Sequence, residues 1–534
     1  MIGLSPVAIL TLVVPALLAA GAIVFALAAG PCAPFVSRAA ARLENPRATR
    51  TALALAMALY VAWLGSGSLA RHWRLETETY DLGNVEQATW NTLHGRFFRM
   101  TTDPEYEMNL QHGTRFPELP DHRWAFHVEP ILLAMLPIYA ALPRAETLLM
   151  IQTLLLAAGA IPAYMAARAL LGRRAAGVAF AGLYLLNPNL HRGNLFDVHP
   201  LAFAAPFLLG AFALARTGRP RAAFASALAA LACREDMAPA VAILGLIWIA
   251  GGSRRLGGAT LAAAAIWGAL VFGAIMPQVN PQGSIFAKRF VLASGPRDLM
   301  RIIVTEPGVV IWFLTRPARL AYEAYLLLPF AFLPLAGPHL LLLAAPGFAT
   351  IVFSAHDESG LLRGLYHYHA ALVPGMLLGA AWALSRLWRR GDPARREKLR
   401  LAVVVAMLFL TVATAIAWKD PAWAWPALDR RRLAAVDRAR RLIPPDAGVA
   451  ASYVLGPHVA RRRNLYTLYS PNHAKADYLF LADCRKEGCD GMPRARYEAE
   501  IAAFRADPAW RLLFEGEGIL LLGRSRADGG AGHD

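Results

Sequence analysis

The residue best suited to chemistry in this sequence is Asp81, which lies in the segment Thr79-Tyr-Asp-Leu-Gly83. The stretch that follows, 82–95, places apolar residues on one helical face, and it is too short and polar to span a membrane. We therefore expect a helix that lies at the membrane interface. A carboxylate just before it could act as a catalytic base or a metal ligand. The alternative is that Asp81 is the N-cap of the helix. Glu86 and Gln87, on the same helix, are predicted substrate-binding residues.

A second polar pair, His127 and Glu129, precedes an apolar run that ends at Leu142. The run is short, and a full span follows it and ends in arginines. We therefore interpret 128–142 as a second interfacial helix, with Pro130 in its first turn. His127 and Glu129 could bind substrate, or could hold a divalent metal cation together with Asp81. Helix capping and solvation are the alternatives for this pair.

Three further polar groups interrupt apolar stretches. Ionisable groups at membrane depth are costly, so each is a candidate functional site, and snorkelling to the interface is the alternative. The predicted substrate-binding residues among them are Asp236 and His367. The spacing of His367 and His369 is poor for a two-histidine metal site on a strand or a helix. The three groups are Asp197-Val-His199-Pro200, Arg234-Glu235-Asp236 and Tyr366-His367-Tyr-His369.

Basic residues recur in the predicted outer loop 278–318 and just after it, against the usual gathering of Lys and Arg on the cytoplasmic side. A bound phosphate would explain them, because the arginine fork matches phosphate oxygens. Contact with lipid headgroups is the alternative. The residues are Lys288, Arg289, Arg297, Arg301, Arg316 and Arg319.

Of the four cysteines, only one pair is placed to form a disulfide. Cys484 and Cys489 close a short loop and could form a disulfide in an oxidising compartment, with two free thiols as the alternative. Cys32 and Cys233 fall in or beside membrane segments and are predicted to be inert. The sequence contains no Gly-rich phosphate loop, nucleophile elbow or HExxH zinc motif.

Composition identifies the elements that must position these residues. Of 534 residues, 57% are hydrophobic and 17% are charged, whereas a soluble protein carries about 25% charged residues. A soluble enzyme, a disordered chain and a secreted disulfide scaffold are therefore excluded. Apolar runs predict about twelve membrane spans. These lie near 6–29, 51–70, 146–170, 174–190, 199–215, 221–233, 236–252, 259–277, 319–336, 338–354, 366–388 and 398–418.

The net charge of +17 is explained by topology. With one crossing at each span, the arginine clusters of alternate connectors all fall on the cytoplasmic side. A nucleic-acid partner is not needed to account for the charge. The first span has no basic region before it and is long, so we expect it to be retained rather than cleaved as a signal peptide.

The predicted domains are three. Residues 1–50 form an extra span and a cytoplasmic connector, residues 51–418 form the membrane domain with its outer loop 71–145, and residues 419–534 form a small extracytoplasmic α/β domain. In the last domain, strand-like runs cover 448–454, 477–481 and 518–523, and a helical stretch covers 497–506.

Several motifs resemble an uncharacterised prokaryotic family of integral-membrane proteins, over roughly residues 55–525. That family in turn resembles the GT-C glycosyltransferase superfamily, whose first outer loop carries an acidic residue and two juxtamembrane helices. In this sequence Asp81 is followed by Leu82, where many GT-C enzymes have two adjacent acids. The motifs are Tyr80-Asp-Leu-Gly83, Gln87-Ala-x-Trp90-Asn91-Thr-Leu-His94-Gly95, His127-x-Glu129-Pro130, Leu186-Asn187-Pro188, Asp197-x-His199-Pro200, Glu235-Asp236 and Pro444-Pro445.

The resemblance implies an inverting transfer of a sugar from a polyprenyl-phosphate donor at the outer leaflet of the cytoplasmic membrane. Asp81 would be the general base, Lys288 and Arg289 would stabilise the departing phosphate, and the tail would bind a glycan, lipid or protein acceptor. Two other hypotheses are a transporter or flippase of lipid-linked envelope material and an inactive scaffold. The mostly apolar spans favour a one-sided site over a pathway through the membrane.

Overall fold

The structure is a computed structural model, and it divides into two compact units. It describes residues 6–28, 33–102, 121–281, 290–354, 362, 366–387, 392–423, 426–468, 471–484, 490 and 493–525. Unit 1 comprises Met1–Gly67, Val128–Ile131 and Ile151–Trp425. Unit 2 comprises Ser68–His127, Leu132–Met150 and Pro426–Asp534, so residues of the predicted outer loop are grouped with the tail.

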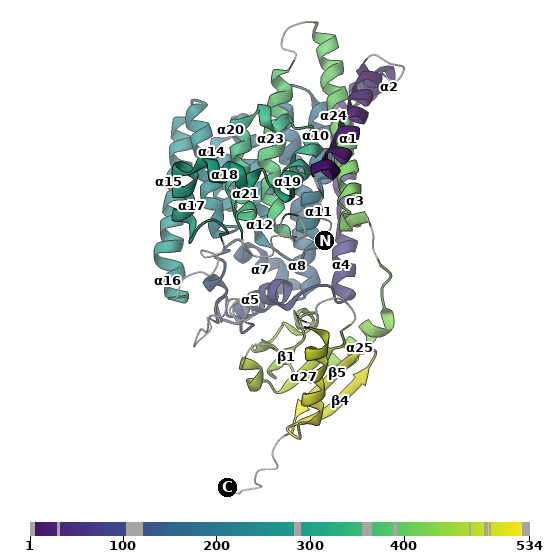
Figure 1. Cartoon of the computed structure of the whole chain (residues 1–534), viewed down its shortest axis with the longest axis vertical. Helices are drawn as coiled ribbons and strands as arrows, with labels where there is room; N and C mark the ends of the chain where they lie inside the picture. The colour runs from purple at the N-terminus through teal and green to yellow at the C-terminus, as the bar shows by residue number, and fades with distance from the viewer. Residues whose placement is uncertain are drawn as a thin grey trace. The chain divides into compact units, whose positions relative to one another are not determined.

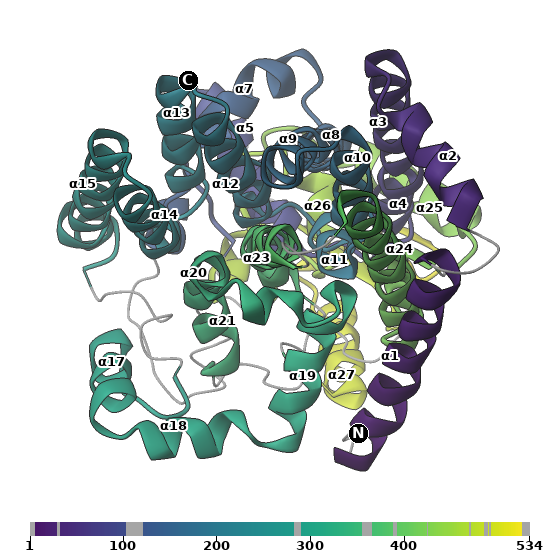
Figure 2. The same cartoon turned by 90° about the horizontal axis from the view of Figure 1, so that it is seen from above.

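Unit 1 is helical. Figures 1 and 2 show α1 beside α24 and α14 beside α15, while α9, α10, α12 and α23 lie together. Its α-helices are α1 (Pro6–Ala28), α2 (Ala33–Leu43), α3 (Pro46–Tyr60), α9 (Ala160–Leu171), α10 (Arg174–Leu185), α11 (Pro188–Leu195), α12 (Pro200–Arg216), α13 (Pro220–Leu231), α14 (Ala238–Ala250), α15 (Arg254–Leu270), α16 (Met276–Val279), α17 (Pro296–Thr305), α18 (Pro307–Leu314), α19 (Pro317–Leu327), α20 (Pro338–Leu341), α21 (Ala345–Val352), α23 (Val373–Arg386) and α24 (Pro393–Ala417). Short π or 3₁₀ turns are η1 (Val61–Gly65), η4 (Glu235–Met237), η5 (Val271–Ile275), η7 (Leu328–Phe330), η8 (Leu333–Ala336), η9 (Leu342–Ala344), η10 (His367–Leu372) and η11 (Pro421–Trp423). Helices α4 (Ser66–Trp73) and α8 (Ala145–Ala158) have residues in both units.

Among the described residues, five helices are long and apolar enough to cross a membrane. They are Pro46–Trp73, Ala145–Leu171, Arg254–Val279, His367–Arg386 and Arg395–Ala417. Shorter apolar helices cover five more stretches: Val13–Leu27, Leu132–Ala141, Arg174–Leu185, Pro200–Arg216 and Pro338–Val352. The structure thus supports a polytopic helical protein, while the count of twelve spans stays a prediction.

Two predicted spans are not continuous helices. The predicted span 319–336 breaks after α19, where Ala331 and Phe332 have positive φ values of 50° and 59°. Pro329 and Pro334 lie on either side of this break, and proline cannot continue an α-helical hydrogen-bond ladder. The predicted span 174–190 ends at Leu185, because the Asn187 side chain caps a new helix.

The predicted loop 278–318 is also partly helical, because α17 and α18 form within it. Each begins with proline in its first turn, which is a favourable position for this residue. Neither helix is among those long and apolar enough to cross a membrane, so the placement of 278–318 as an outer connector stays a prediction.

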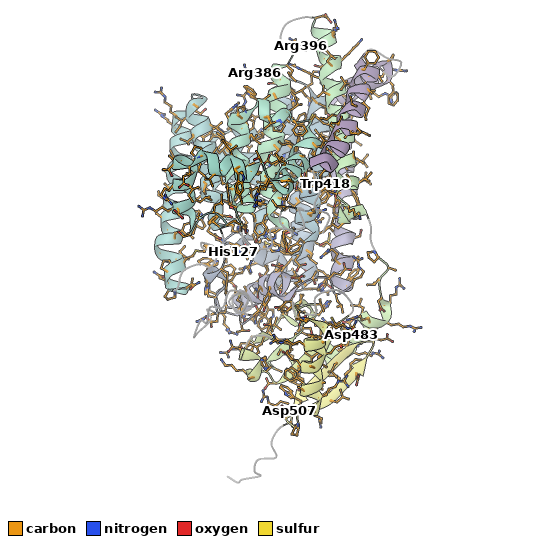
Figure 3. All side chains as sticks on the ribbon, viewed as in Figure 1. His127, Arg386, Arg396, Trp418, Asp483 and Asp507 are labelled. Atoms are coloured by element: carbon orange, nitrogen blue, oxygen red, sulfur yellow. The ribbon has the colours of Figure 1, made fainter. Side chains whose placement is uncertain are left out.

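Charged residues from three predicted cytoplasmic connectors meet in unit 1. Glu44 accepts hydrogen bonds from Arg173 Nε at 3.1 Å and from the Ala175 N–H at 3.2 Å. Arg173 Nε also lies 3.5 Å from Glu397. Figure 3 shows Arg386 and Arg396 at one end of this unit, where α23 ends and α24 begins. This arrangement agrees with placing these connectors on one side of the membrane.

A fully buried pair, His191 and Asp420, ties α11 to the chain that follows α24. His191 Nδ1 lies 2.7 Å from Asp420 Oδ2, and His191 Nε2 lies 2.7 Å from the Leu185 carbonyl oxygen. Both ring nitrogens thus have an oxygen partner within hydrogen-bond distance, so neither polar group of this buried pair is left without a partner. Trp63 packs edge-on against the ring at 5.3 Å and donates Nε1–H to the Ala422 carbonyl at 3.0 Å. Through Trp63, η1 therefore packs against this buried pair.

Removing one member of this pair should destabilise the protein. His191→Leu or Asp420→Leu leaves a buried polar partner uncompensated, which costs about 3–5 kcal/mol. The measurement is thermal unfolding of the purified protein in detergent micelles. The double variant should lose less than the sum of the two single variants, because it leaves neither polar partner buried alone. Additive losses would contradict a coupled pair.

Unit 2 contains a five-stranded mixed sheet in the order β2-β1-β3-β5-β4. Strand β1 is parallel to β2 and β3, whereas β5 is antiparallel to β3 and β4. The elements of unit 2 outside α4 and α8 are η2 (Thr79–Gly83), α5 (Asn84–Leu93), η3 (Arg123–Ala125), α7 (Leu132–Ala141), α25 (Arg430–Arg441), β1 (Val449–Ala451), α26 (Gly456–Val459), β2 (Leu465–Thr467), η12 (Pro471–Lys475), β3 (Tyr478–Ala482), α27 (Arg494–Ala506), β4 (Trp510–Gly516) and β5 (Ile519–Arg524).

Both faces of this sheet are covered, as Figure 1 shows with α25 and α27 beside the strands. Alternate strand residues point to opposite faces. Phe480 and Leu521 pack with residues of α25, whereas Leu479 and Leu522 pack with Tyr497 of α27. A sheet buried on both faces needs apolar residues at consecutive positions, and this explains the runs that predicted β1, β3 and β5.

Candidate functional site

Asp81 lies in η2, a single π-helical turn that runs directly into α5. The N-cap positions are Glu78 for η2 and Gly83 for α5, and neither makes a side-chain capping bond. Asp81 is itself inside the helical turn, so its interpretation as the N-cap was wrong. The side chain is only partly buried. Single π turns are frequent at functional sites, so this geometry supports the chemical interpretation of Asp81.

The turn that carries Asp81 is fastened to the sheet of unit 2. The Thr79 N–H and hydroxyl both donate to the Tyr453 carbonyl oxygen, at 2.8 and 2.7 Å. The Tyr80 hydroxyl lies 3.2 Å from the Tyr453 hydroxyl and 3.3 Å from the Thr467 hydroxyl. Tyr453 follows β1, and Thr467 ends β2. The contacts of Thr79 and Tyr80, the two residues before Asp81, therefore fix the backbone at Asp81.

Glu86 and Gln87 are buried on α5 and contact different parts of unit 2. The Gln87 amide donates to Thr101 Oγ1 at 2.9 Å and accepts from the Thr101 N–H at 2.9 Å. It also reaches the carbonyl oxygen of Arg463 at 3.2 Å, so its polar atoms link α5 to two other segments. Glu86 instead lines a pocket, where it accepts a hydrogen bond from the Tyr139 hydroxyl at 3.3 Å.

In unit 1, three motifs that are far apart in the sequence form one cluster, which we call the histidine cluster. The rings of His199 and His367 stack with centroids 3.3 Å apart and planes 5° apart. Tyr368 lies against His367 at 4.1 Å, and the Arg234 guanidinium lies 5.3 Å from the Tyr368 ring centre. Arg234 Nε donates to Asp236 Oδ1 at 2.8 Å. The predicted residues Asp236 and His367 therefore belong to one contiguous group.

The segment that bears Glu129 is also fixed within unit 1. The Val128 N–H donates to Glu235 Oε2 at 2.9 Å, and the Ile131 N–H donates to the Ala232 carbonyl at 2.9 Å. The predicted helix over 128–142 is observed as α7, which starts only at Leu132. Glu129 and Pro130 consequently precede the helix, because the N–H groups on either side of them donate to η4 and to the end of α13.

A buried glutamine, Gln152 on α8, shapes the turn before His199. Its Nε2 donates to the Asp197 carbonyl at 2.6 Å, and its Oε1 accepts from the His199 N–H at 2.9 Å. Asp197 has a φ of 48°, which is uncommon for a residue other than glycine. The sequence reasoning missed Gln152, although a lone amide inside a predicted span is a signal for such a role.

The predicted site residues are divided between the units. Asp81, Glu86, Gln87 and His127 belong to unit 2, whereas Glu129, Asp236 and His367 belong to unit 1. Within the described ranges, no group of three or more His, Cys, Asp or Glu residues could hold a metal ion. A divalent cation held by Asp81, His127 and Glu129 therefore stays a prediction.

Two predictions fall on residues outside the described ranges. Lys288 and Arg289, the expected phosphate ligands, lie there, and so does Cys489, the expected disulfide partner of Cys484. Four nearby arginines are described. Arg297 is exposed, Arg301 donates to Asp298 at 2.9 Å, and Arg316 and Arg319 lie over the rings of Trp312 and Phe313.

These observations define a polytopic helical membrane protein in which polar residues gather on short turns at the ends of helices. The chain belongs to the DUF2079 family, described as predicted membrane proteins, whose model matches residues 71–500. None of the curated proteins matches the chain.

Two solved structures show partial similarity. One is ArnT from Cupriavidus metallidurans bound to undecaprenyl phosphate, with 10% identity, a TM-score of 0.48, and coverage of 88% of this chain and 97% of that chain. The other is the archaeal oligosaccharyltransferase AglB from Archaeoglobus fulgidus, in complex with an inhibitory peptide and a dolichol-phosphate. Its identity is 13%, its TM-score is 0.45, and the match covers 90% of this chain and 75% of that chain. Both TM-scores lie below 0.5, so neither match assigns an activity to this chain.

Packing behind the Asp81 turn yields a test. A Cβ added at Gly456 would meet the Thr79 side chain, with Cγ2 only 2.7 Å away. Gly456→Ala should therefore push Thr79 away from Tyr453 and lower stability by about 1–3 kcal/mol, measured by thermal unfolding in detergent. The matched control is Gly258→Ala on α15, where the added Cβ has nothing within 4 Å. An unchanged unfolding temperature for Gly456→Ala would show that the turn is loosely held.

Proposed function

We propose that this protein is a GT-C-like membrane glycosyltransferase that uses a polyprenyl-phosphate-linked sugar donor at the outer leaflet and inverts the anomeric centre. The observation that carries the proposal is the position of Asp81. This partly exposed carboxylate lies on a π turn shortly after the span Pro46–Trp73, and the turn is fixed to the sheet through Thr79. A rigidly held carboxylate near a membrane surface suits a general base.

In the proposed reaction, an acceptor hydroxyl attacks the anomeric carbon of the donor sugar. The hydroxyl proton passes to the Asp81 carboxylate as the new C–O bond forms. The bond between the anomeric carbon and the lipid phosphate oxygen breaks, and the electron pair leaves with the phosphate. The negative charge that develops there needs positive partners, a role we assign to Lys288 and Arg289. His127, in the same unit, would orient Asp81, and Glu129 would bind substrate.

The histidine cluster of unit 1 is the second part of the proposal. We assign His367 and Asp236 to recognition of the donor sugar, because carboxylate and imidazole groups match sugar hydroxyls as acceptors and donors. The tight stack of His199 on His367 and the Arg234–Asp236 hydrogen bond limit the freedom of both side chains. Such preorganisation favours binding of one ligand geometry.

The location and the partners follow from the same proposal. We place the protein in the cytoplasmic membrane, with the α/β sheet of unit 2 on the outer side and the acceptor bound there. The acceptor would be a glycan, a lipid or a protein. The lipid phosphates named for ArnT and AglB belong to the donor class proposed here, although the proposal does not depend on those matches.

Replacing Asp81 tests the catalytic assignment. Asp81→Asn keeps the size of the side chain but removes the base, so transfer from a synthetic polyprenyl-phosphate sugar should fall by about 10²–10⁴-fold. The matched control is Asp446→Asn, an exposed position of unit 2, which should transfer sugar at the wild-type rate. Equal expression and equal unfolding temperatures establish that both variants are folded.

The transfer assay also distinguishes a glycosyltransferase from a flippase. Wild-type transfer by Asp81→Asn would overturn the assignment of the base. Movement of lipid-linked sugar across proteoliposome membranes without any transfer would instead identify a flippase. Repeating the assay with EDTA, and then with added Mg²⁺ or Mn²⁺, tests the proposed divalent cation.

A further inference from the structure

Unit 2 contains a polar pocket that the proposed transfer reaction does not use. Its walls come from the end of α4, from α5, from the start of α8 and from α25 and α26. Its cavity volume is about 180 Å³, which is smaller than the roughly 300–1,000 Å³ of sites for drug-sized ligands and suits a small polar group. Asp81 is not among its lining residues. The pocket therefore has room for a ligand of its own.

The charges in this pocket are incompletely paired. Arg440 donates to Asp437 at 2.9 Å, and Glu146 accepts the Trp73 indole N–H at 3.3 Å. By contrast, Arg144 has no hydrogen bond or ion pair from its guanidinium within the part of the chain that the structure describes. Arg461 Nη1 donates to the Pro143 carbonyl at 2.8 Å, and its Nε lies 3.9 Å from Glu86. Two guanidinium groups thus lack a close carboxylate.

Glu86 is the buried carboxyl group of this pocket. Burial raises the pKa of Glu86 to about 8, against a lowering effect of Arg461, while Glu146 raises it further and Tyr139 and Arg440 lower it. The other charged or titratable groups that line the pocket are His72, Arg144, Asp437 and His458. At neutral pH Glu86 is mostly protonated, so it adds an O–H donor to the pocket in place of a negative charge.

His458 supplies the second observation that points to a ligand. Its ring stacks on His72 with centroids 4.2 Å apart and planes 12° apart. Its Nε2 atom is buried and lacks a hydrogen-bond partner among the described residues. Burial and the neighbouring His72 lower the pKa of His458 well below its usual range, so the ring is neutral. Buried polar atoms are nearly always partnered, and a ligand in the pocket would supply the missing partner.

We propose that this pocket binds the phosphate group of a phosphate monoester, held by Arg144 and Arg461, with Glu86 as an additional hydrogen-bond donor and the His458 Nε2 atom as an acceptor for a hydroxyl group of the ligand. Two guanidinium groups and one O–H offer more donors than the two oxygens of a carboxylate can use, and they suit the three terminal oxygens of a phosphate. The rest of the ester would extend from the open side of the pocket. The phosphate comes either from a soluble sugar phosphate or from a phosphate-bearing lipid headgroup.

Calorimetric titration of the full-length protein in detergent tests this site. Inorganic phosphate should bind saturably at pH 7, and Arg144→Gln or Arg461→Gln should each weaken binding by roughly tenfold or more. Arg144 is exposed and has no partner to lose, so its replacement should not affect folding. The matched control is Arg511→Gln, an exposed arginine on β4, which should bind like the wild type.

The dependence on pH isolates the contribution of Glu86. Raising the pH from 7 to 9 ionises Glu86 and places a negative charge against the phosphate, so the wild-type affinity should fall by about tenfold relative to that of Glu86→Gln. Glu86→Gln cannot ionise and keeps donor hydrogens, so its affinity should change only as the phosphate itself ionises. The same change in both proteins would show that Glu86 does not contact the ligand.

Further probes identify the source of the phosphate. Tighter binding of glucose 1-phosphate than of inorganic phosphate supports a soluble sugar phosphate, whereas competition only by phosphatidate in mixed micelles supports a lipid headgroup. No saturable binding of any phosphate probe, or tighter binding of acetate or citrate, would overturn the proposal. A failure of phosphate binding leaves the proposed sugar transfer untouched, because the transfer assay measures a different reaction with a different variant, Asp81→Asn.

Discussion

Two hydrogen bonds from Thr79 to the carbonyl oxygen of Tyr453 fix the position of the turn that bears Asp81. They join this turn to the chain just after β1, across 374 positions of sequence. Tyr453 lies only two residues beyond the strand, so the turn is tied to a sheet that is covered on both faces. Gly456 allows this close approach, because any side chain there would occupy the space of Thr79.

In unit 1, turns and helix ends are fixed by pairs of buried polar groups. Its polar residues are few, and burial would make each of them costly if it were left alone. They are instead grouped: His191 with Asp420, Gln152 with the turn before His199, and Arg234 with Asp236. Each group fixes a helix end or a short turn, so the irregular chain between apolar helices becomes as well defined as the helices themselves.

Much of the fold could be predicted from the sequence, because long apolar runs dictate membrane helices and consecutive apolar residues dictate covered strands. The first helix and the strands β1, β3 and β5 followed from such runs. Strand β2 has only three residues, and β4 is an edge strand with exposed positions. Both therefore lack the pattern that would identify them.

The candidate sites were less predictable, because they depend on contacts between distant segments. The sequence indicated Asp236 and His367 as separate polar interruptions, but it could not show that Tyr368 and Arg234 connect them. It indicated Glu86 on an interfacial helix, but the pocket around it needs residues from the tail that have no motif of their own. Pairing across hundreds of residues leaves no local periodic signal.

The order of the segments in unit 2 has a consequence for biosynthesis. The unit is built from Ser68–His127, Leu132–Met150 and Pro426–Asp534, so its last part leaves the ribosome long after the first two. Until then, the Gln87 amide lacks the Arg463 carbonyl, and Thr79 lacks its acceptor on Tyr453. The nascent chain must keep these polar groups hydrated while the intervening helices insert. The contacts of Thr79 and Gln87 therefore form only after the C-terminal part of unit 2 has been synthesised.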